Sequence, residues 1–290
     1  MAIDFTNLHP TFGARSSEID LRQAQEPLLQ QIREAMDRFG FLVFPNQRFD
    51  FQQQLDFASR LDGQLHSKTS AAAIAKNRFG NEALTDISNV DADGQVLAHD
   101  DRRRMSGVAN RLWHTDASFE DPAGRYSMLF ARNLPPVRAD TQFADMRTAY
   151  DDLDADTKAQ ISRYTVRHSI VHSRHVLGFD FSAEESARLP GAVHPLVRHF
   201  PEIGRKSLYL ASHAERIMEL PVPEGRLLLR DLIEHATRER YVFSHEWRLG
   251  DLVIWDNRAT MHRARPFDDK RYKRELTRVT TLDLPRAAAH

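Results

Sequence analysis

The sequence predicts a mostly β protein with helical decoration, built as a jelly roll or β-sandwich. From about residue 85 onward, strand-like segments dominate and long insertions separate them. Helical patterns gather toward the N-terminus, and no Gly-x-Gly-x-x-Gly follows a strand, which disfavours a dinucleotide-binding fold. We expect one domain over 1–290, with an N-terminal α/β portion of about 1–85 packed on the jelly-roll core.

The N-terminal portion alternates helix and strand. Apolar residues recur at helical spacing over 27–40, and Gly40 is a stop signal. The segment 41–45, Phe-Leu-Val-Phe-Pro, is typical of a short buried strand that proline ends. Asp50 is then placed to cap a second helix whose apolar side begins at Phe51.

The remaining chain carries four long strand patterns, at 125–135, 206–212, 240–257 and 273–284. Within the third, Leu249-Gly250-Asp251 predicts a hairpin turn. Helical patterns interrupt the strands at about 148–163 and 224–238.

Composition excludes several classes of function. The 40 Lys and Arg nearly balance the 41 Asp and Glu, unlike the strongly basic face of a general nucleic-acid binder. No stretch approaches the ~20 apolar residues of a membrane span, and the N-terminus lacks a signal-peptide pattern. The chain has no cysteine, so a metal must be held by His, Asp or Glu. We expect a cytoplasmic protein that binds neither nucleic acid nor membrane.

The segment NRLWHTDASF, 110–119, contains a first pair of candidate metal ligands. If 111–119 is extended, His114 and Asp116 point to the same side, because side chains alternate along a strand. Taken alone, a polar strand face explains the pair more simply.

A rival metal site lies in HSIVHSRH, which holds His168, His172 and His175. On a helix these histidines share one face, which could bind zinc. On a strand, His175 points away from the other two. No Glu sits between them as a general base, so we favour a structural role.

A lone histidine and two arginines follow much later in the chain. His262 lies after the strand pattern DLVIWDN and could complete a 2-His-1-carboxylate triad for non-haem Fe(II). Arg274 and Arg278 share one strand face, ~13 Å apart at ~3.3 Å per residue. Each could hold a carboxylate in a bidentate fork, one on a cosubstrate and one on an anionic substrate.

The sequence resembles the taurine and aryloxyacetate type of Fe(II)/α-ketoglutarate-dependent dioxygenases. The resemblance runs through most of the chain in seven segments: FLVFPNQ, DISNV, NRLWHTDASF, DTQFADMRTAYDDL, HPLVRHFPEIGRKSLYL, GDLVIWDNRATMHRA and RELTRVTTLD. The text GRYSMLF, the tail RELTR and the histidine of ASHAERI bring it nearest to the aryloxyacetate branch. The family fold is a double-stranded β-helix, which agrees with the strand pattern.

The resemblance implies roles for seven residues. His114, Asp116 and His262 match the iron ligands and the catalytic centre, and Trp113 and Asn257 flank them. The remaining matches are Thr141 and Arg274 for α-ketoglutarate, and Arg278 and His213 for the substrate.

Two segments depart from the family pattern. Arg138-Ala139 stands where the family usually has two glycines, which weakens the match of Thr141. The segment 66–82, a substrate-covering loop in the family, also follows it poorly. Its Lys68, Lys76 and Arg78 could contact an anion, although we favour solvated loop charges.

The implied activity uses Fe(II), α-ketoglutarate and O2 to oxidise an aryloxyalkanoate, such as a phenoxyacetate herbicide or a related aromatic acid. The ether would be cleaved to a phenol and an oxoacid, with release of succinate and CO2. The alternative is a dioxygenase of the same type that acts on a taurine-like sulfonate, an alkyl sulfate or another small carboxylate. A jelly-roll protein that uses zinc at 168–175 is a more distant possibility. We also expect a homo-oligomer.

Overall fold

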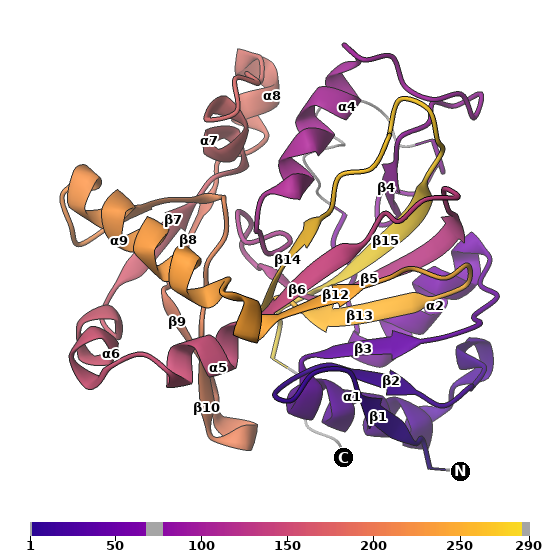
Figure 1. Ribbon diagram of the computed structural model, residues 1–290, viewed down its shortest axis with the longest axis horizontal. Coiled ribbons are helices and arrows are strands. Elements are labelled where there is room, and N and C mark those ends of the chain that lie inside the picture. The colour runs from indigo at the N-terminus through magenta and orange to yellow at the C-terminus, as the bar shows by residue number, and fades with distance from the viewer. Residues whose placement is uncertain (1, 68–77, 286–290) are drawn as a thin grey trace.

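A large twisted sheet forms the main layer of the computed structural model, which describes residues 2–67 and 78–285 (Figure 1). The strand order is β1-β2-β3-β13-β5-β15-β4. Its strands are β1 (Phe5–Asn7), β2 (Ala14–Ser16), β3 (Phe41–Phe44), β4 (Thr85–Ser88), β5 (Gly124–Asn133), β13 (Leu252–Asp256) and β15 (Glu275–Leu282). The N-terminal segment thus contributes three strands to the same sheet as the later β-strands.

A smaller sheet forms the second layer. It has the order β12-β6-β14, from β6 (Thr141–Asp145), β12 (Val242–His245) and β14 (Thr260–Ala264). Apolar side chains fill the space between the layers: Phe41 of the main sheet stacks on Phe143 of the small one, with ring centroids 4.4 Å apart. The two facing sheets confirm the predicted jelly-roll class.

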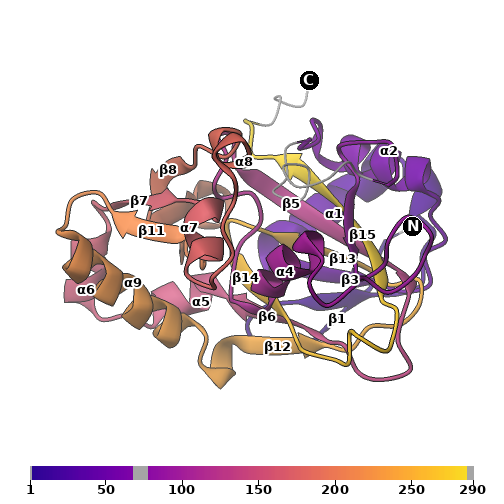
Figure 2. The ribbon, with the colours of Figure 1, turned by 90° about the horizontal axis from the view of Figure 1, so that it is seen from above.

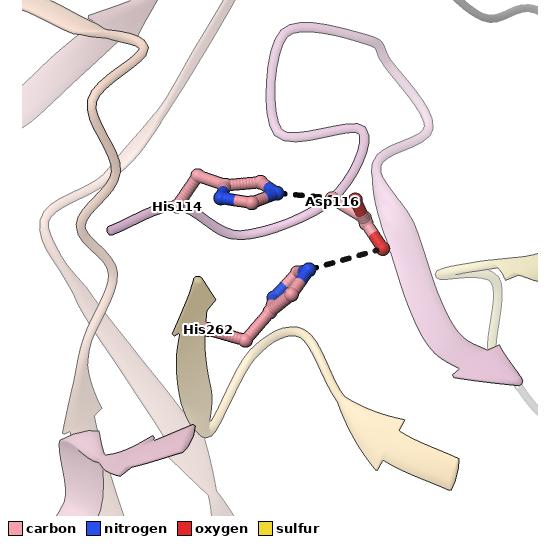
Figure 3. Close-up of side chains that lie close together, drawn as sticks. All are labelled: His114, Asp116 and His262. Atoms are coloured by element: carbon pink, nitrogen blue, oxygen red, sulfur yellow. Dashed lines mark ion pairs between the residues drawn. The ribbon is translucent and has the colours of Figure 1, made fainter. Parts of the chain in front are cut away.

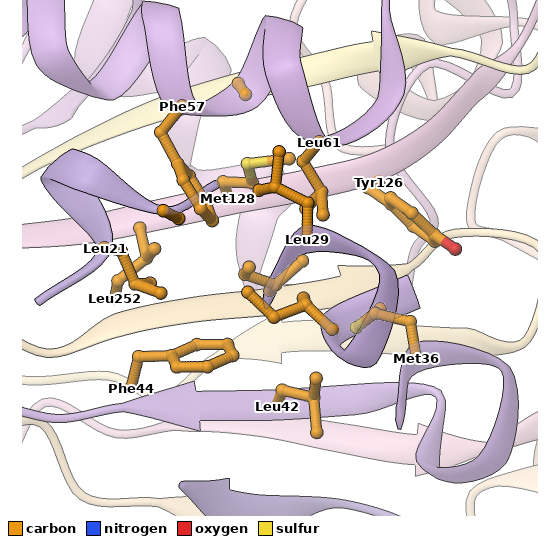
Figure 4. Packing of buried hydrophobic residues seen from close by; sticks show 14 of the residues in the cluster. Leu21, Leu29, Met36, Leu42, Phe44, Phe57, Leu61, Tyr126, Met128 and Leu252 are labelled. Carbon is orange, nitrogen blue, oxygen red and sulfur yellow. The ribbon is translucent and has the colours of Figure 1, made fainter. Parts of the chain in front are cut away.

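Two helices cover the outer face of the main sheet, α1 (Glu26–Phe39) and α2 (Phe51–Asp62). Figure 4 shows the resulting core, in which Leu29 and Met36 of α1 and Phe57 and Leu61 of α2 belong to one cluster with side chains of the strands. Gly40 ends α1 in the left-handed conformation, at φ 70°. Asp50 caps α2 through a hydrogen bond from the backbone N–H of Gln53, as predicted.

An insertion lies beside the jelly roll, on the left in Figure 1, and carries its own core. Its strands are β7 (Thr165–His168), β8 (Ala192–Pro195), β9 (Val197–Phe200), β10 (Arg205–Leu208) and β11 (Ala214–Ile217). Its helices and those at its base are α5 (Met146–Asp151), α6 (Ala155–Ile161), α7 (Ile170–His175), α8 (Ala183–Ala187) and α9 (Val222–Ala236). In Figure 1, α7 and α8 lie toward the top, as does α4 (Arg102–Gly107), and Figure 2 shows the three helices from above. The single helix expected at about 148–163 forms instead as two helices, α5 and α6.

The predicted hairpin at Leu249-Gly250-Asp251 is wrong. β12 pairs with β6 and β13 pairs with β3 and β5, so the turn carries the chain from one sheet to the other. The turn's backbone bonds join it to the main sheet, since Gly250 donates to the carbonyl of Ala131 and accepts from the N–H of Gln47. A turn sequence fixes the local bend but not the strand that each arm joins.

No helix in the described part of the chain is both long and apolar enough to cross a membrane.

We predict that Gly250→Ala destabilises the protein more than Gly94→Ala does. Both glycines have positive φ, 81° and 73°, which costs an L-residue about 1–2 kcal/mol. Only at Gly250 would the new Cβ also meet a backbone atom, the Gln47 oxygen at 2.9 Å. Urea unfolding of both variants measures the difference, and equal losses would show that the close approach carries no energetic weight.

Candidate metal centre and active site

The backbone brings the three predicted metal ligands together. His114 and His262 form an isolated antiparallel bridge, with N···O distances of 2.9 and 2.8 Å in the two directions. The expectation of an extended segment over 111–119 is only partly met, because the chain turns from Asp116 and Ala117 has a φ of 54°. The turn still leaves Asp116 facing the two histidines (Figure 3).

The side-chain atoms of these residues converge on one point. His114 Nε2 lies 3.9 Å from Asp116 Oδ1, and His262 Nε2 lies 3.8 Å from Asp116 Oδ2. All three residues are buried, and their candidate ligand atoms lie within 4.8 Å of one another. Such a set of two imidazoles and one carboxylate offers three donors on one side of an ion.

The two histidines are prepared to donate lone pairs. His114 Nδ1 lies 2.8 Å from the carbonyl oxygen of Leu112. A carbonyl only accepts, so Nδ1 carries the proton and Nε2 is left free to bind a metal. Burial is the main cause that lowers the pKa of His114, and it lowers the pKa of His262 well below its ordinary value. Both imidazoles are therefore neutral at pH 7.

Asp116 is held as a carboxylate by its neighbours. Burial raises the pKa of Asp116, but Arg278 and the two histidines outweigh burial and lower the pKa to about 2. Ser127 Oγ donates to Oδ2 at 2.7 Å, and Arg278 Nη1 donates to Oδ1 at 2.5 Å. Asn257 accepts the Asp116 backbone N–H at 3.0 Å and donates to Ser127 at 2.9 Å.

Of the two flanking residues, Asn257 thus supports a candidate ligand. Trp113 packs in the core of the insertion, with the guanidinium of Arg263 4.5 Å from its ring centroid.

A cavity of about 480 Å³ extends from the histidines to Thr141 and Arg274. Arg274 is buried, and its Nε and Nη2 have no hydrogen-bond partner among the described residues. Burial lowers the pKa of Arg274 to about 10, so it remains charged at neutral pH. Trp247, which the sequence did not single out, donates from Nε1 to Thr141 Oγ1 at 3.0 Å.

A second pocket, of about 40 Å³, is lined by two of the three candidate ligands, His114 and Asp116. Both residues assigned to the substrate, His213 and Arg278, line it together with Phe119 and Arg174. The His213 ring centroid is 5.9 Å from that of His114. All seven residues that the sequence singled out therefore meet around two adjoining cavities.

The rival histidine cluster does not converge. His168 is buried at the end of β7, whereas His172 and His175 lie on α7. His168 Nδ1 bonds to Ser118 Oγ at 2.9 Å, and the exposed His175 pairs with Asp180 at 2.6 Å. This arrangement agrees with a structural role for the cluster.

Arg78 is not a solvated loop charge, because it forms ion pairs with Asp86 at 2.6 Å and Glu275 at 2.9 Å. Lys68 and Lys76 lie outside the described residues. Arg138 is exposed and pairs with Asp140, at 2.5 Å.

Comparison with known proteins identifies the family of the chain. Residues 4–280 match the model of the Taurine catabolism dioxygenase TauD, TfdA family. The chain belongs to this family, which confirms the resemblance.

Two relatives and one solved structure show the branch. The alpha-ketoglutarate-dependent 2,4-dichlorophenoxyacetate dioxygenase of Burkholderia sp. (strain RASC) is 42% identical over 97% of this chain and 95% of its own. The (S)-phenoxypropionate/alpha-ketoglutarate-dioxygenase of Sphingobium herbicidovorans is 33% identical over 92% and 91%. The crystal structure of AAD-2 in complex with Mn(II) and N-oxalylglycine has a TM-score of 0.92 at 41% identity, covering 97% of this chain and 98% of that one.

We predict that His168→Gln reduces the acid sensitivity of the fold. Burial lowers the pKa of His168 from 6.5 to about 3, so the unfolded chain takes up the proton first as the pH falls. Stability is thus unaffected above pH 6.5 and falls below it, by about 2 kcal/mol at pH 5 for this residue. The free energy of unfolding, measured at pH 7 and pH 5, should drop by that much less in the variant than in the wild type.

The exposed His199 provides a matched control as His199→Gln. Equal drops in wild type and His168→Gln would contradict the prediction.

Proposed function

We propose that the protein is an Fe(II)- and α-ketoglutarate-dependent dioxygenase that oxidises aryloxyalkanoates, cleaving the ether to a phenol and an oxoacid. Succinate and CO2 are the products of the cosubstrate. One observation carries the proposal: the two histidines of a buried triad of two imidazoles and one carboxylate line the same cavity as Arg274, whose Nε and Nη2 have no partner among the described residues. The names of relatives that match almost the whole chain support the same activity.

The triad fits a non-haem iron. His114, Asp116 and His262 would hold the ion by two neutral imidazole nitrogens and one carboxylate oxygen, the donor set typical of Fe(II) oxygenases. The hydrogen bonds of Ser127 and Asn257 keep Asp116 oriented toward the ion. When bound, iron and α-ketoglutarate together supply the oxidising power from O2.

The Arg274 end of the cavity fits a dicarboxylate. The guanidinium would clamp the carboxylate far from the metal in a bidentate fork, using the nitrogens that lack a partner. The hydroxyl of Thr141 receives the Trp247 N–H and can donate its own proton to the same carboxylate.

The Arg278 side suits an anionic substrate. Arg278 and His213 line the small pocket next to the candidate ligands, and Phe119 offers an aromatic wall. This geometry would place the substrate carbon that is next to the ether oxygen near the metal.

The alternative substrates carry the same anionic end. A sulfonate, an alkyl sulfate or another small carboxylate would also satisfy Arg278. The aromatic side chain of Phe119, which lines the same pocket and could pack against a ring, is what favours an aryloxyalkanoate. A cytoplasmic location and a homo-oligomeric state stay predictions.

We predict that Asp116→Ala weakens Mn(II) binding at least about 100-fold, because the loss of a support for a ligand already costs 10–100-fold. Calorimetric titration of the metal-free protein measures the affinity, and succinate release measures activity. Asp180→Ala is the control, since it removes a carboxylate from the exposed pair with His175. Full metal binding and activity in Asp116→Ala would show that the triad assignment is wrong.

We predict that phenoxyacetates stimulate succinate release more strongly than sulfonates or alkyl sulfates do. The reason is the aromatic wall beside the anion-binding residues. The measurement is kcat/KM across a panel of all three substrate classes with Fe(II) and α-ketoglutarate present. Absence of stimulation by every phenoxyacetate would overturn the proposed substrate class.

A further inference from the structure

Arg174 is a buried cation without a carboxylate. It lies on α7, is 5% exposed, and forms no ion pair with any described residue within 4.0 Å. Its Nε has no hydrogen-bond partner among residues 2–67 and 78–285. Burying a charge without a counter-charge is costly, so an arginine kept in this state requires a reason.

Comparison with the other buried arginines gives that reason. Arg125 pairs with Asp62 and Asp283, and Arg147 lies 4.0 Å from Asp145. In the part of the chain that the structure describes, only two buried arginines lack such a partner, Arg174 and Arg274. Both line the 480 Å³ cavity, and Arg274 is the residue that would hold the cosubstrate's far carboxylate. The anionic group of a ligand would supply the missing counter-charge of Arg174, as the cosubstrate's carboxylate would for Arg274.

The charges that line the small pocket also favour a bound anion. Arg174 and Arg278 both line it, and Asp116 is the carboxylate that they share it with. Asp116 is already bonded to Arg278, and a metal ion bound there would draw on the same carboxylate. One positive charge is therefore left without compensation, and it lies beside the apolar side chains of Phe119 and Ile170.

A directed chain of hydrogen bonds holds Arg174 in place. Arg174 Nη1 lies 3.3 Å from His213 Nε2, and because arginine only donates, this nitrogen accepts. The proton of His213 is then on Nδ1, facing Ser118 Oγ at 3.4 Å, and Ser118 donates in turn to His168 Nδ1 at 2.9 Å. His213 thus acts on the substrate as a positioning residue, through Arg174.

We propose that Arg174 is a specificity-determining residue that binds the anionic group of the substrate together with Arg278. The carboxylate lies between the two guanidinium groups, and the aromatic ring lies against Phe119 and Ile170. This inference rests on the proposed function. Arg174 is not among the seven residues to which the family resemblance assigned a role.

The test is Arg174→Gln, compared with Arg188→Gln, which removes an exposed arginine paired with Glu184. A hydrogen bond to a charged group corresponds to about 10- to 100-fold in affinity. We expect KM for phenoxyacetate to rise by that factor, while KM for α-ketoglutarate stays within about twofold. The control variant should match the wild type.

A binding measurement separates recognition of charge from a structural effect. Protein loaded with Mn(II) and N-oxalylglycine is titrated with phenoxyacetate and with its neutral analogue, phenoxyacetamide. In Arg174→Gln the affinity for the anion should fall about 10- to 100-fold and that for the amide should change little. Equal losses for the two ligands would overturn the proposal.

Thermal unfolding reports whether Arg174→Gln folds. If it does not, Arg174→Lys decides, because lysine keeps the charge and loses the fork. If Arg174→Lys binds phenoxyacetate more weakly and phenoxyacetamide as well as before, the role proposed for Arg174 is supported. Unchanged binding of both ligands overturns it.

The two proposals fail in different ways. If Arg174→Gln turns over phenoxyacetate with an unchanged KM, the role proposed for Arg174 is wrong, and the proposed function of the enzyme is unaffected. The wild type could instead bind and turn over only sulfonates or alkyl sulfates, with weaker binding in Arg174→Gln. In that case the aryloxyalkanoate assignment is wrong, and the role of Arg174 in binding the anionic group is supported.

Discussion

The paired backbone hydrogen bonds between His114 and His262 are the constraint on which the site depends. They join a segment that follows a short helix to a strand of the small sheet, far apart in the sequence. The two imidazoles are thereby fixed next to each other, with ring centroids 4.1 Å apart. Asp116 needs only the next turn of the chain to reach them. The jelly roll thus supplies the distance between ligands, and the side chains supply the chemistry.

Much of the fold follows from local patterns in the sequence. The helix that Gly40 ends, the cap at Asp50 and the strands around 125–135 and 273–284 form as predicted, because each depends on nearby residues. The turn at Gly250 does not, because its bend is local but the partners of its two arms are not. The expected extended structure over 111–119 is only partly formed for a similar reason, because the bridge to His262 fixes His114 and the chain turns at Asp116.

The site was predictable where the resemblance supplied the residues, and less so elsewhere. Trp247 became visible only through its bond to Thr141, which joins the loop after β12 to the first residue of β6. Arg174 stands between two histidines that drew attention as metal ligands. Its one sequence signal is the lack of an acidic residue three or four positions away on either side, where 170, 171, 177 and 178 are all apolar or glycine.

The hydrogen-bonded chain from Arg174 to His168 begins and ends in the insertion, at α7 and β7, and passes through Ser118, which follows the candidate metal ligands His114 and Asp116. His213 and Ser118 each donate their one proton away from Arg174, so the direction of these bonds is set by the guanidinium, which can only donate. The insertion is therefore not a peripheral addition to the jelly roll. Changes in its packing could alter which anions the enzyme accepts while the metal ligands stay untouched, so metal binding and substrate choice could evolve separately in this fold.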